Sequence, residues 1–123
     1  MIAADTSTWI SFFEGDRGDD VAALAKALQS RQVVMLPPVL TELLSDPELP
    51  AQVANTLLEL PLVELKGGFW QRAGRLRAKV LAKKRKARLG DALIAQCCID
   101  ADVALITRDG DFTAFSAGLN LLS

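Results

Sequence analysis

The segment from Leu89 to Phe112 decides the fold, and it reads LGDALIAQCCIDADVALITRDGDF. Apolar residues after Gly90 recur at helical spacing, which predicts a helix with Asp91 at its start. The short apolar run 103–106 follows, and such a run is typical of a buried parallel strand. The segment therefore indicates an α/β unit in which a helix start and a strand end both carry carboxylates.

The composition narrows the class of protein. The chain has 123 residues, half of them hydrophobic, which suits a single domain over residues 1–123. It has no histidine, which excludes Ser-His-Asp and Cys-His catalysis and zinc sites built on histidine. The adjacent Cys97 and Cys98 are poor disulfide partners, so we expect buried thiols in a reducing cytoplasm. We expect no signal peptide and no membrane segment, because no apolar run is long enough to span a bilayer.

Strands and helices alternate along the rest of the chain. Further strands are expected at 2–4, 33–36, 62–65 and 119–122. Further helices are expected after Asp5, over about 19–30, around 39–44 and 53–58, and over about 69–86. This alternation predicts a three-layer α/β/α fold with a mainly parallel sheet of four to five strands.

Four carboxylates are expected at one edge of that sheet. Asp5 follows the first strand, Glu42 lies one helical turn after the second, and Asp109 follows the fourth. Asp91 joins them, because its helix leads back to a strand that runs in the same direction. Converging carboxylates raise one another's pKa, and a hard divalent cation relieves that repulsion. A pocket of carboxylates without histidine suits Mg²⁺ or Mn²⁺ better than zinc.

Each acid taken alone also has a structural explanation. Asp5 and Asp91 fit helix caps, and for each of them capping is the better single explanation. Asp109 and Asp111 fit ordinary turn residues. Glu42 is harder to explain structurally, because it lies among apolar residues with no basic residue four positions later. The joint placement of four acids on four elements favours a functional site.

Four segments also carry a family resemblance, and they occur in the following order: Asp5-Thr6-Ser7, Thr41-Glu42-Leu43-Leu44, Gly90-Asp91-Ala92-Leu93-Ile94-Ala95 and Thr107-Arg108-Asp109-Gly110-Asp111-Phe112. They resemble the PIN domain, in particular the VapC-type toxins of bacterial toxin–antitoxin pairs. The resemblance implies a Mg²⁺- or Mn²⁺-dependent ribonuclease that a cognate antitoxin inhibits, and it implies a homodimer. It also implies the catalytic and metal-binding acids, which are Asp5, Glu42, Asp91 and Asp109.

The expected reaction is hydrolysis of an RNA phosphodiester with one metal ion or two. Asp109 and Asp111 are both available as the last acid, and Asp109 is favoured because it lies nearer the strand end. Thr6 and Thr107 are placed to orient a ligand water or a carboxylate, and Asp111 is expected in the same supporting role.

Nine of the fourteen basic residues lie between Gly67 and Gly90, a stretch without any acid. A solvated helix face is the usual explanation of such a run, but solvated helices commonly mix charges of both signs. We therefore favour a track for RNA phosphates, even though the net charge of the chain is only −1. The predicted RNA-binding residues are Arg72, Arg75, Lys79, Lys83, Lys86 and Arg88, of which the first five share one predicted helical stripe.

Trp9, Phe12 and Phe13 form a second unusual group. At least two of them are expected in the core, and the remainder could line a groove for an antitoxin helix or a second copy of the chain.

Two alternative functions compete with the nuclease. One is a non-catalytic RNA- or partner-binding domain of the same fold, against which the intact set of acids argues. The other is a phosphoacceptor receiver domain, which needs paired acids after the first strand and a lysine after the last. Here Thr6 follows Asp5, and no lysine follows Leu119, so this second alternative is weak.

Overall fold

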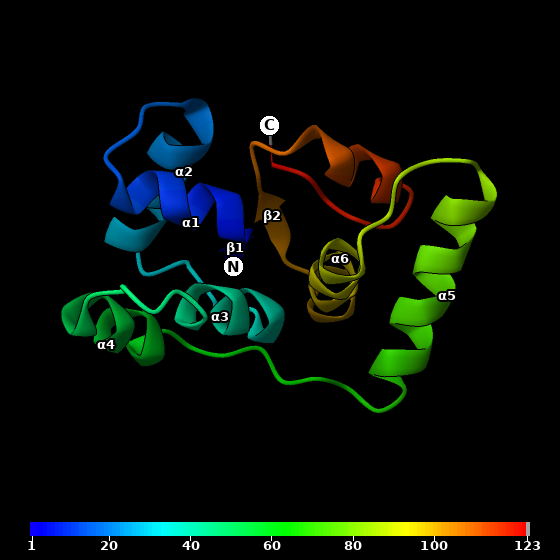
Figure 1. The fold of residues 1–123 in the computed structure, drawn as a ribbon, viewed down its shortest axis with the longest axis horizontal. Helices are drawn as coiled ribbons and strands as arrows, with labels where there is room; N and C mark the ends of the chain where they lie inside the picture. The colour runs from blue at the N-terminus through cyan, green and yellow to red at the C-terminus, as the bar shows by residue number, and fades with distance from the viewer. Residues whose placement is uncertain (123) are drawn as a thin grey trace.

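The computed structural model describes residues 1–122, and its helices and strands alternate along the chain (Figure 1). The strands are β1 (Ile2–Ala4) and β2 (Ala104–Ile106). The helices are α1 (Thr6–Phe13), α2 (Asp19–Gln29), α3 (Pro37–Leu44), α4 (Ala51–Glu59), α5 (Phe69–Ala82), α6 (Leu89–Ala101) and the 3₁₀ helix η1 (Gly110–Phe115). This order of elements confirms the predicted α/β class.

The sheet is parallel but shorter than predicted. Strands β1 and β2 pair in parallel, with Ala3 opposite Leu105. Isolated parallel bridges extend this pair: Ile2 with Val33, Met35 with Leu62, and Leu105 with Leu121. The five predicted segments therefore lie side by side, although 33–36, 62–65 and 119–122 are bridges rather than full strands. The reason is that each of these segments meets its neighbour at single positions and not along a continuous ladder.

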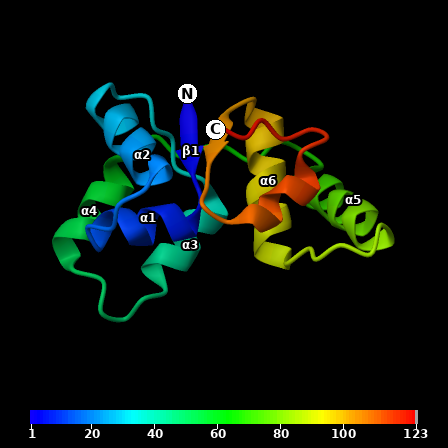
Figure 2. The same ribbon diagram turned by 90° about the horizontal axis from the view of Figure 1, so that it is seen from above.

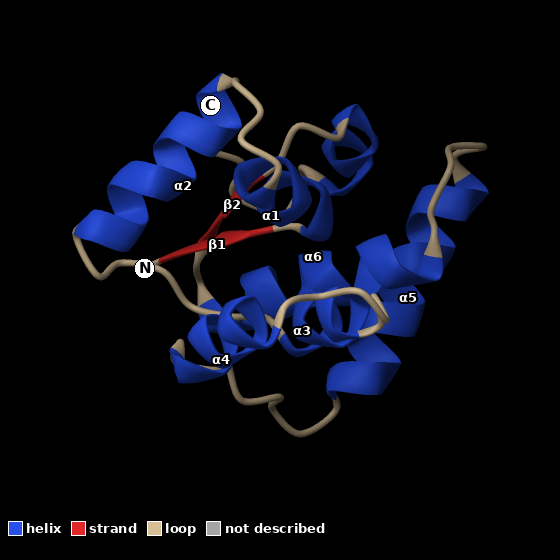
Figure 3. Ribbon diagram, turned by 60° about the vertical axis from the view of Figure 1, so that its left-hand side comes forward, coloured by secondary structure: helices blue, strands red, loops and turns tan. Residues whose placement is uncertain are grey.

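Helices lie on both sides of the strands. Figures 1 and 2 show α1 and α2 on one side of β1 and β2, and α5 and α6 on the other. Both α2 and α6 contact β2, and Figure 3 shows the strands enclosed by helices. Leu24 of α2, Leu105 of β2 and Ile94 of α6 are buried in the resulting core. Burial of each such side chain contributes about 1.5–3 kcal/mol, so packing against the strands holds the layers together.

Helix α5 ends at Ala82, four residues earlier than predicted. Lys84 adopts the left-handed conformation, with φ +61°. Its N–H and that of Arg85 bond back to carbonyls of the last helical turn, which is the pattern of a Schellman motif. No glycine marks this turn, so the sequence pattern does not reveal it. Lys83 and Lys86 therefore lie beyond the helix, and the predicted stripe of five basic residues on one helix is wrong.

The cysteines and the aromatic residues of α1 are placed as predicted. Cys97 and Cys98 are buried and unpaired, and burial raises the pKa of both thiols to about 12. Trp9 is buried and Phe12 packs against the core, whereas Phe13 is 37% exposed. Within residues 1–122, no helix is both long and apolar enough to cross a membrane.

Candidate metal centre

Asp5 lies directly after β1 and forms the N-cap of α1. Its carboxylate accepts hydrogen bonds from the Thr8 backbone N–H at 3.0 Å and from the Ser7 hydroxyl at 2.8–2.9 Å. The Thr107 hydroxyl donates to Asp5 Oδ2 at 2.6 Å, so this contact joins the ends of β1 and β2. The capping explanation is therefore correct for Asp5. The same side chain also lies at the carboxyl edge of the sheet, as predicted.

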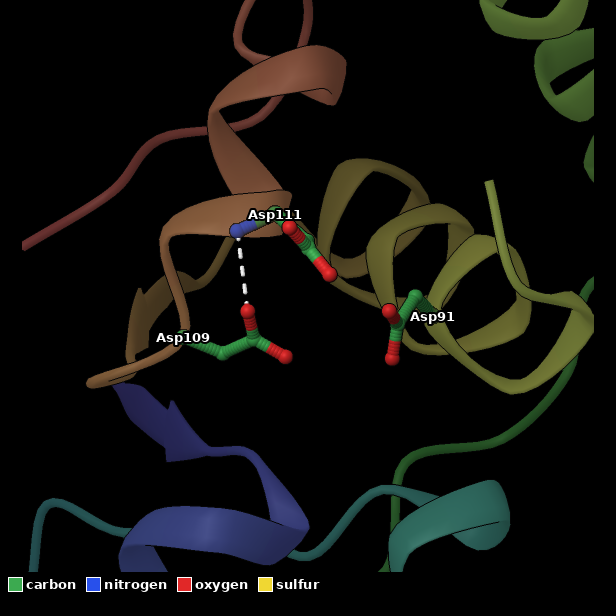
Figure 4. Close-up of side chains that lie close together, drawn as sticks. All are labelled: Asp91, Asp109 and Asp111. Carbon is green, nitrogen blue, oxygen red and sulfur yellow. Dashed lines mark hydrogen bonds between the residues drawn. The ribbon is translucent and has the colours of Figure 1, made fainter. Parts of the chain in front are cut away.

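The chain after β2 turns into η1 and carries two aspartates. Asp109 caps η1, because its Oδ1 accepts from the Asp111 N–H at 2.9 Å. The Asp109 N–H donates to the Thr107 hydroxyl oxygen at 2.9 Å, which fixes the start of the turn. Figure 4 shows that this turn brings the side chains of Asp109 and Asp111 to the start of α6. Their turn geometry thus places two carboxylates at one point.

Asp91 lies opposite these two aspartates, in the first turn of α6 (Figure 4). Single carboxylate oxygens of Asp91, Asp109 and Asp111 all lie within 4.8 Å of one another. Arg88 occupies the N-cap position of α6, so the capping explanation is wrong for Asp91. The helix start still favours negative charge at this position.

The electrostatics of Asp91 connect all four predicted acids. Burial raises the pKa of Asp91 to about 6, and the charge of Asp109 acts in the same direction. The nearby Arg88 opposes this rise, while Asp5 and Glu42 add to it. A carboxyl group with a raised pKa among like charges is typical of a pocket that favours a bound cation.

Glu42 approaches the pocket from α3. Its exposed side chain accepts a hydrogen bond from the Thr6 hydroxyl at 2.9 Å. A Cβ atom built on Gly90 would lie 3.9 Å from Glu42 Oε1, so this carboxylate borders the first turn of α6. Of the four predicted acids, the structure groups Asp91 with Asp109 and places Asp5 and Glu42 outside the group of three carboxylates.

The donor set fits a hard divalent cation. The grouped ligand atoms are carboxylate oxygens, and the chain has no histidine. Mg²⁺ and Mn²⁺ prefer oxygen ligands, and Mg²⁺ commonly retains several waters. Asp91 and Asp109, with Asp111 or Asp5, are the residues that could hold such an ion.

The predicted RNA-binding residues fall into two groups. Lys86 and Arg88 lie between α5 and α6, and the Lys86 ammonium is 3.3 Å from Asp111 Oδ2. Arg75 and Lys79 lie on α5, where they line a groove against the second half of α6. The first group therefore borders the acids, and the second forms a separate basic surface.

Arg72 is engaged within the fold. It donates two hydrogen bonds to Asp100, at 2.5 and 3.2 Å, and a third to the Gly67 carbonyl at 2.7 Å. The Asp100 contact raises the pKa of Arg72 and lowers the pKa of Asp100. Lys83, in contrast, is exposed in the loop after α5.

Two features of the pocket differ from the sequence prediction: a contact of Ser7 that was not predicted, and the position of Asp111. Ser7 contacts both oxygens of Asp5, and a hydroxyl two positions after a capping aspartate is the signal for it. Asp111 was predicted in a supporting role, yet it belongs to the group of three carboxylates. The Asp-Gly-Asp pattern is the only sequence signal for that turn.

Comparison with known proteins gives one family and several similar folds. Residues 2–117 match the family described as PIN domain. No curated protein matches the chain. VapBC2 from Rickettsia felis, bound to a DNA fragment from its promoter, aligns over 99% of this chain and 98% of its own, with 20% identity and a TM-score of 0.76. FitAcB from Neisseria gonorrhoeae aligns over 100% and 97%, with 17% identity and a TM-score of 0.72.

A third similar structure is VapC20 from Mycobacterium tuberculosis, described as a sarcin-ricin loop cleaving toxin. It aligns over 99% of this chain and 98% of its own, with 20% identity and a TM-score of 0.63. At these identities the likeness shows a shared fold.

Proposed function

The chain belongs to the PIN domain family, and on that premise we propose that it is a metal-dependent endoribonuclease, the toxin of a toxin–antitoxin pair. The observation that carries the proposal is the group of three carboxylates, Asp91, Asp109 and Asp111, whose oxygens lie within 4.8 Å of one another. VapC20, which shares the fold, is described as cleaving the sarcin-ricin loop, and this supports RNA as the substrate class.

The acids have different roles in the proposed hydrolysis. Asp91 and Asp109 would be the main ligands of Mg²⁺ or Mn²⁺, because the Asp111 carboxylate is already paired with the Lys86 ammonium. A bound divalent ion would polarise a phosphate oxygen and lower the pKa of a bound water. Glu42 lies outside the group of three, and while its Oε1 accepts from the Thr6 hydroxyl, its other carboxylate oxygen would accept a proton from the attacking water. Asp5, held in place by its hydrogen bonds from Thr8 and Thr107, adds a further carboxylate beside the group of three.

Basic residues would hold the RNA backbone next to this pocket. Lys86 and Arg88 border the acids, which supports a role for them in contacting phosphates near the cleaved bond. Arg75, Lys79 and Lys83 would contact further phosphates along the RNA chain. Phosphate contacts of this kind supply affinity rather than sequence choice.

The proposed antitoxin site is an apolar groove between α1, α3 and α4. The groove has a volume of about 280 Å³, and Ile10, Phe13 and Leu43 contribute to its lining. Ile10 is 45% exposed and Phe13 37% exposed, so two large apolar side chains of α1 are accessible at this one groove. Glu42 lies at the same groove, so a bound segment would also reach the acids. The homodimer expected from the family stays a prediction.

Co-expression with the product of the neighbouring gene, as the candidate antitoxin, tests whether the groove binds a partner. We expect Phe13→Asp to abolish co-purification, because a charge in an apolar groove opposes burial of a partner. Leu58→Asp is the matched control, since Leu58 is exposed on α4 but does not line the groove. Equal retention of the partner by both variants would contradict this assignment.

Cleavage of a labelled single-stranded RNA pool tests the nuclease. We expect cutting with Mg²⁺ or Mn²⁺, no cutting with EDTA, and no cutting by Asp91→Asn. Asp102→Asn is the matched control, because Asp102 is exposed at the other end of α6 and occupies a left-handed position that asparagine tolerates. Cutting that survives in Asp91→Asn would reject the assignment. RNA binding without cleavage under any condition would favour the non-catalytic alternative.

A further inference from the structure

Asp20, in the first turn of α2, joins the two loops that carry Asp5 and Asp109. Its Oδ2 accepts from the Thr8 hydroxyl at 2.9 Å and from Arg108 Nε at 2.8 Å. Its Oδ1 accepts from Arg108 Nη2 at 3.0 Å. Thr8 donates its backbone N–H to Asp5, and Arg108 directly precedes Asp109. Asp20, which lies outside the metal centre, therefore bonds to one residue that contacts Asp5 and to another that precedes Asp109.

These contacts close a ring. Its members, in order, are Asp5, Thr8, Asp20, Arg108 and Thr107. One side of the ring is the direct bond from Thr107 to Asp5, and the other side passes through α2. Neither loop can shift relative to the other without the loss of a bond. The ladder already pairs Ala4 with Ile106, and the ring adds a second link between the two loops, through α2.

In the contact between Asp20 and Arg108, the aspartate is covered and the arginine lies at the surface. The Asp20 side chain is 9% exposed and the Arg108 side chain 35%. The hydrogen bond from Arg108 holds the pKa of Asp20 below its usual range. Loss of Arg108 would leave the covered Asp20 carboxylate with the Thr8 hydroxyl as its remaining side-chain partner, so the arginine helps to hold Asp20 in place.

Gly18 packs directly against this ion pair. A Cβ atom at Gly18 would lie 2.6 Å from Asp20 Oδ1 and 3.0 Å from Arg108 Nη2. Gly18 also has φ +154°, which side-chain-bearing residues rarely adopt. A methyl group added at Gly18 would therefore force the ends of these two side chains to shift.

We propose that Asp20 is a positioning residue of the metal centre. Through Thr8 and Arg108 it fixes the separation of the Asp5 and Asp109 carboxylates, and in this way it sets the affinity for a divalent cation. Asp20 itself contacts no metal ligand. The proposal rests on the metal centre proposed above, and it adds α2 to the elements that determine metal binding.

Mn²⁺ affinity, measured from the electron paramagnetic resonance signal of free Mn²⁺, tests this role. We expect Asp20→Asn and Arg108→Gln each to weaken binding about tenfold, as is typical for partners that orient ligands. The double variant should be no weaker than either single variant, because the two side chains act as a unit. Gly18→Ala should give the same loss while every charge is retained.

The ion pair between Asp100 and Arg72 provides the matched control. It also joins a largely buried aspartate to an arginine through two bonds, but it links α5 to α6 away from the acids. Asp100→Asn should lower the unfolding temperature while the Mn²⁺ affinity stays at the wild-type value. This contrast separates positioning of the ligands from general stability of the fold.

Three outcomes would overturn the proposal or separate it from the nuclease. Wild-type Mn²⁺ affinity in Asp20→Asn would show that the pair only braces the fold. If that variant does not fold, wild-type affinity in Gly18→Ala or in Arg108→Gln would overturn the proposal equally. A wild-type chain that binds no Mn²⁺ would overturn both this role and the metal centre. A chain that binds Mn²⁺ but cuts no RNA would overturn the nuclease alone, and the affinities of the variants would still decide the role of Asp20.

Discussion

Asp5 accepts hydrogen bonds on both carboxylate oxygens, and one donor, the Ser7 hydroxyl, lies within reach of both. The Ser7 hydroxyl has a single proton and lies within 2.9 Å of both oxygens, so it can bond to only one at a time. Thr8 and Thr107 occupy one further site on each oxygen. A carboxylate has about four acceptor sites, so Asp5 keeps capacity for one more contact. Capping and metal binding are thus compatible in this residue.

Asp91 makes the stability of the metal-free protein depend on pH. Its pKa is about 6 in the folded chain and near 3.8 in the unfolded chain. Above pH 6 the Asp91 carboxylate is ionised in both states, and its charge costs more free energy in the folded state. Protonation removes this cost, so the folded state becomes more stable as pH falls toward 4. With EDTA present, we expect the unfolding temperature to rise by a few degrees from pH 7.5 to pH 5.

Other groups contribute little in that pH window. The pKa values of Asp20 and Asp100 are lowered, so the stability that they confer is lost only below about pH 4. Asp91→Asn should abolish the rise and unfold at a higher temperature than wild type at pH 7.5. Differential scanning calorimetry measures both quantities. An equal rise in Asp91→Asn and in wild type would contradict the pKa assignment.

Three of the helices, α2, α5 and α6, end in turns whose left-handed residue is not a glycine. Arg31, Lys84 and Asp102 adopt the left-handed conformation after α2, α5 and α6. Side chains in that conformation are strained by contact between Cβ and the backbone, and glycine avoids this strain. We expect Lys84→Gly to raise the free energy of unfolding by about 0.5–1 kcal/mol.

Lys83→Gly is the control for this substitution. It removes the same charge from the neighbouring position, where φ is −85° and glycine relieves no strain. Urea unfolding should show a higher midpoint for Lys84→Gly and an unchanged or lower midpoint for Lys83→Gly. Equal midpoints for the two variants would argue against strain at Lys84.

The predictability of the elements follows from the strength of their local signals. The start of α1 was predicted well because apolar periodicity follows the capping residue Asp5, and β2 was predicted from its buried apolar run. The start of α6 was predicted from apolar periodicity, although its expected cap, Asp91, lies inside the first turn. The helix over 69–86 was predicted too long, because the Schellman turn at Lys84 has no glycine. The segment 33–36 was predicted as a full strand, because a short apolar run does not reveal how few bridges it makes.

The acidic pocket was predicted in outline but not in detail. The order of strands and helices was sufficient to bring Asp91 and Asp109 together, since both lie at ends of elements that meet at one sheet edge. The position of Asp111 depends on η1, a six-residue 3₁₀ helix that leaves no periodic signal. The ring through Asp20 depends on contacts between residues 88 positions apart, which no local pattern encodes.

On the scale of the whole molecule, charge is separated although the net charge is only −1. Basic residues gather on α5 and in the loop after it, and the acids gather at the start of α6. The ion pair between Lys86 and Asp111 marks the border between the two regions. The acidic pocket alone would repel a polyanion. Once a bound metal has neutralised the pocket, the neighbouring basic residues can guide a polyanion to it.

The basic residues are expected to contribute unequally to RNA binding. In an Asp91→Asn background, which separates binding from cleavage, Arg75→Gln with Lys79→Gln should weaken binding and reduce the salt dependence of affinity by about one unit per lost phosphate contact. Arg72→Gln should mainly lower stability, because Arg72 is bonded to Asp100 and Gly67. Fluorescence anisotropy at several salt concentrations measures the slopes. A larger change of slope in Arg72→Gln than in the double variant would contradict this division.

Anomalous diffraction from crystals grown with Mn²⁺ tests whether acids from separate elements converge on one divalent cation. We predict a single major peak bounded by carboxylates of Asp91 and Asp109, together with Asp5 or Asp111, and no such peak in Asp91→Asn crystals. A well-ordered pocket without a peak, or a peak held by other residues, would contradict the account.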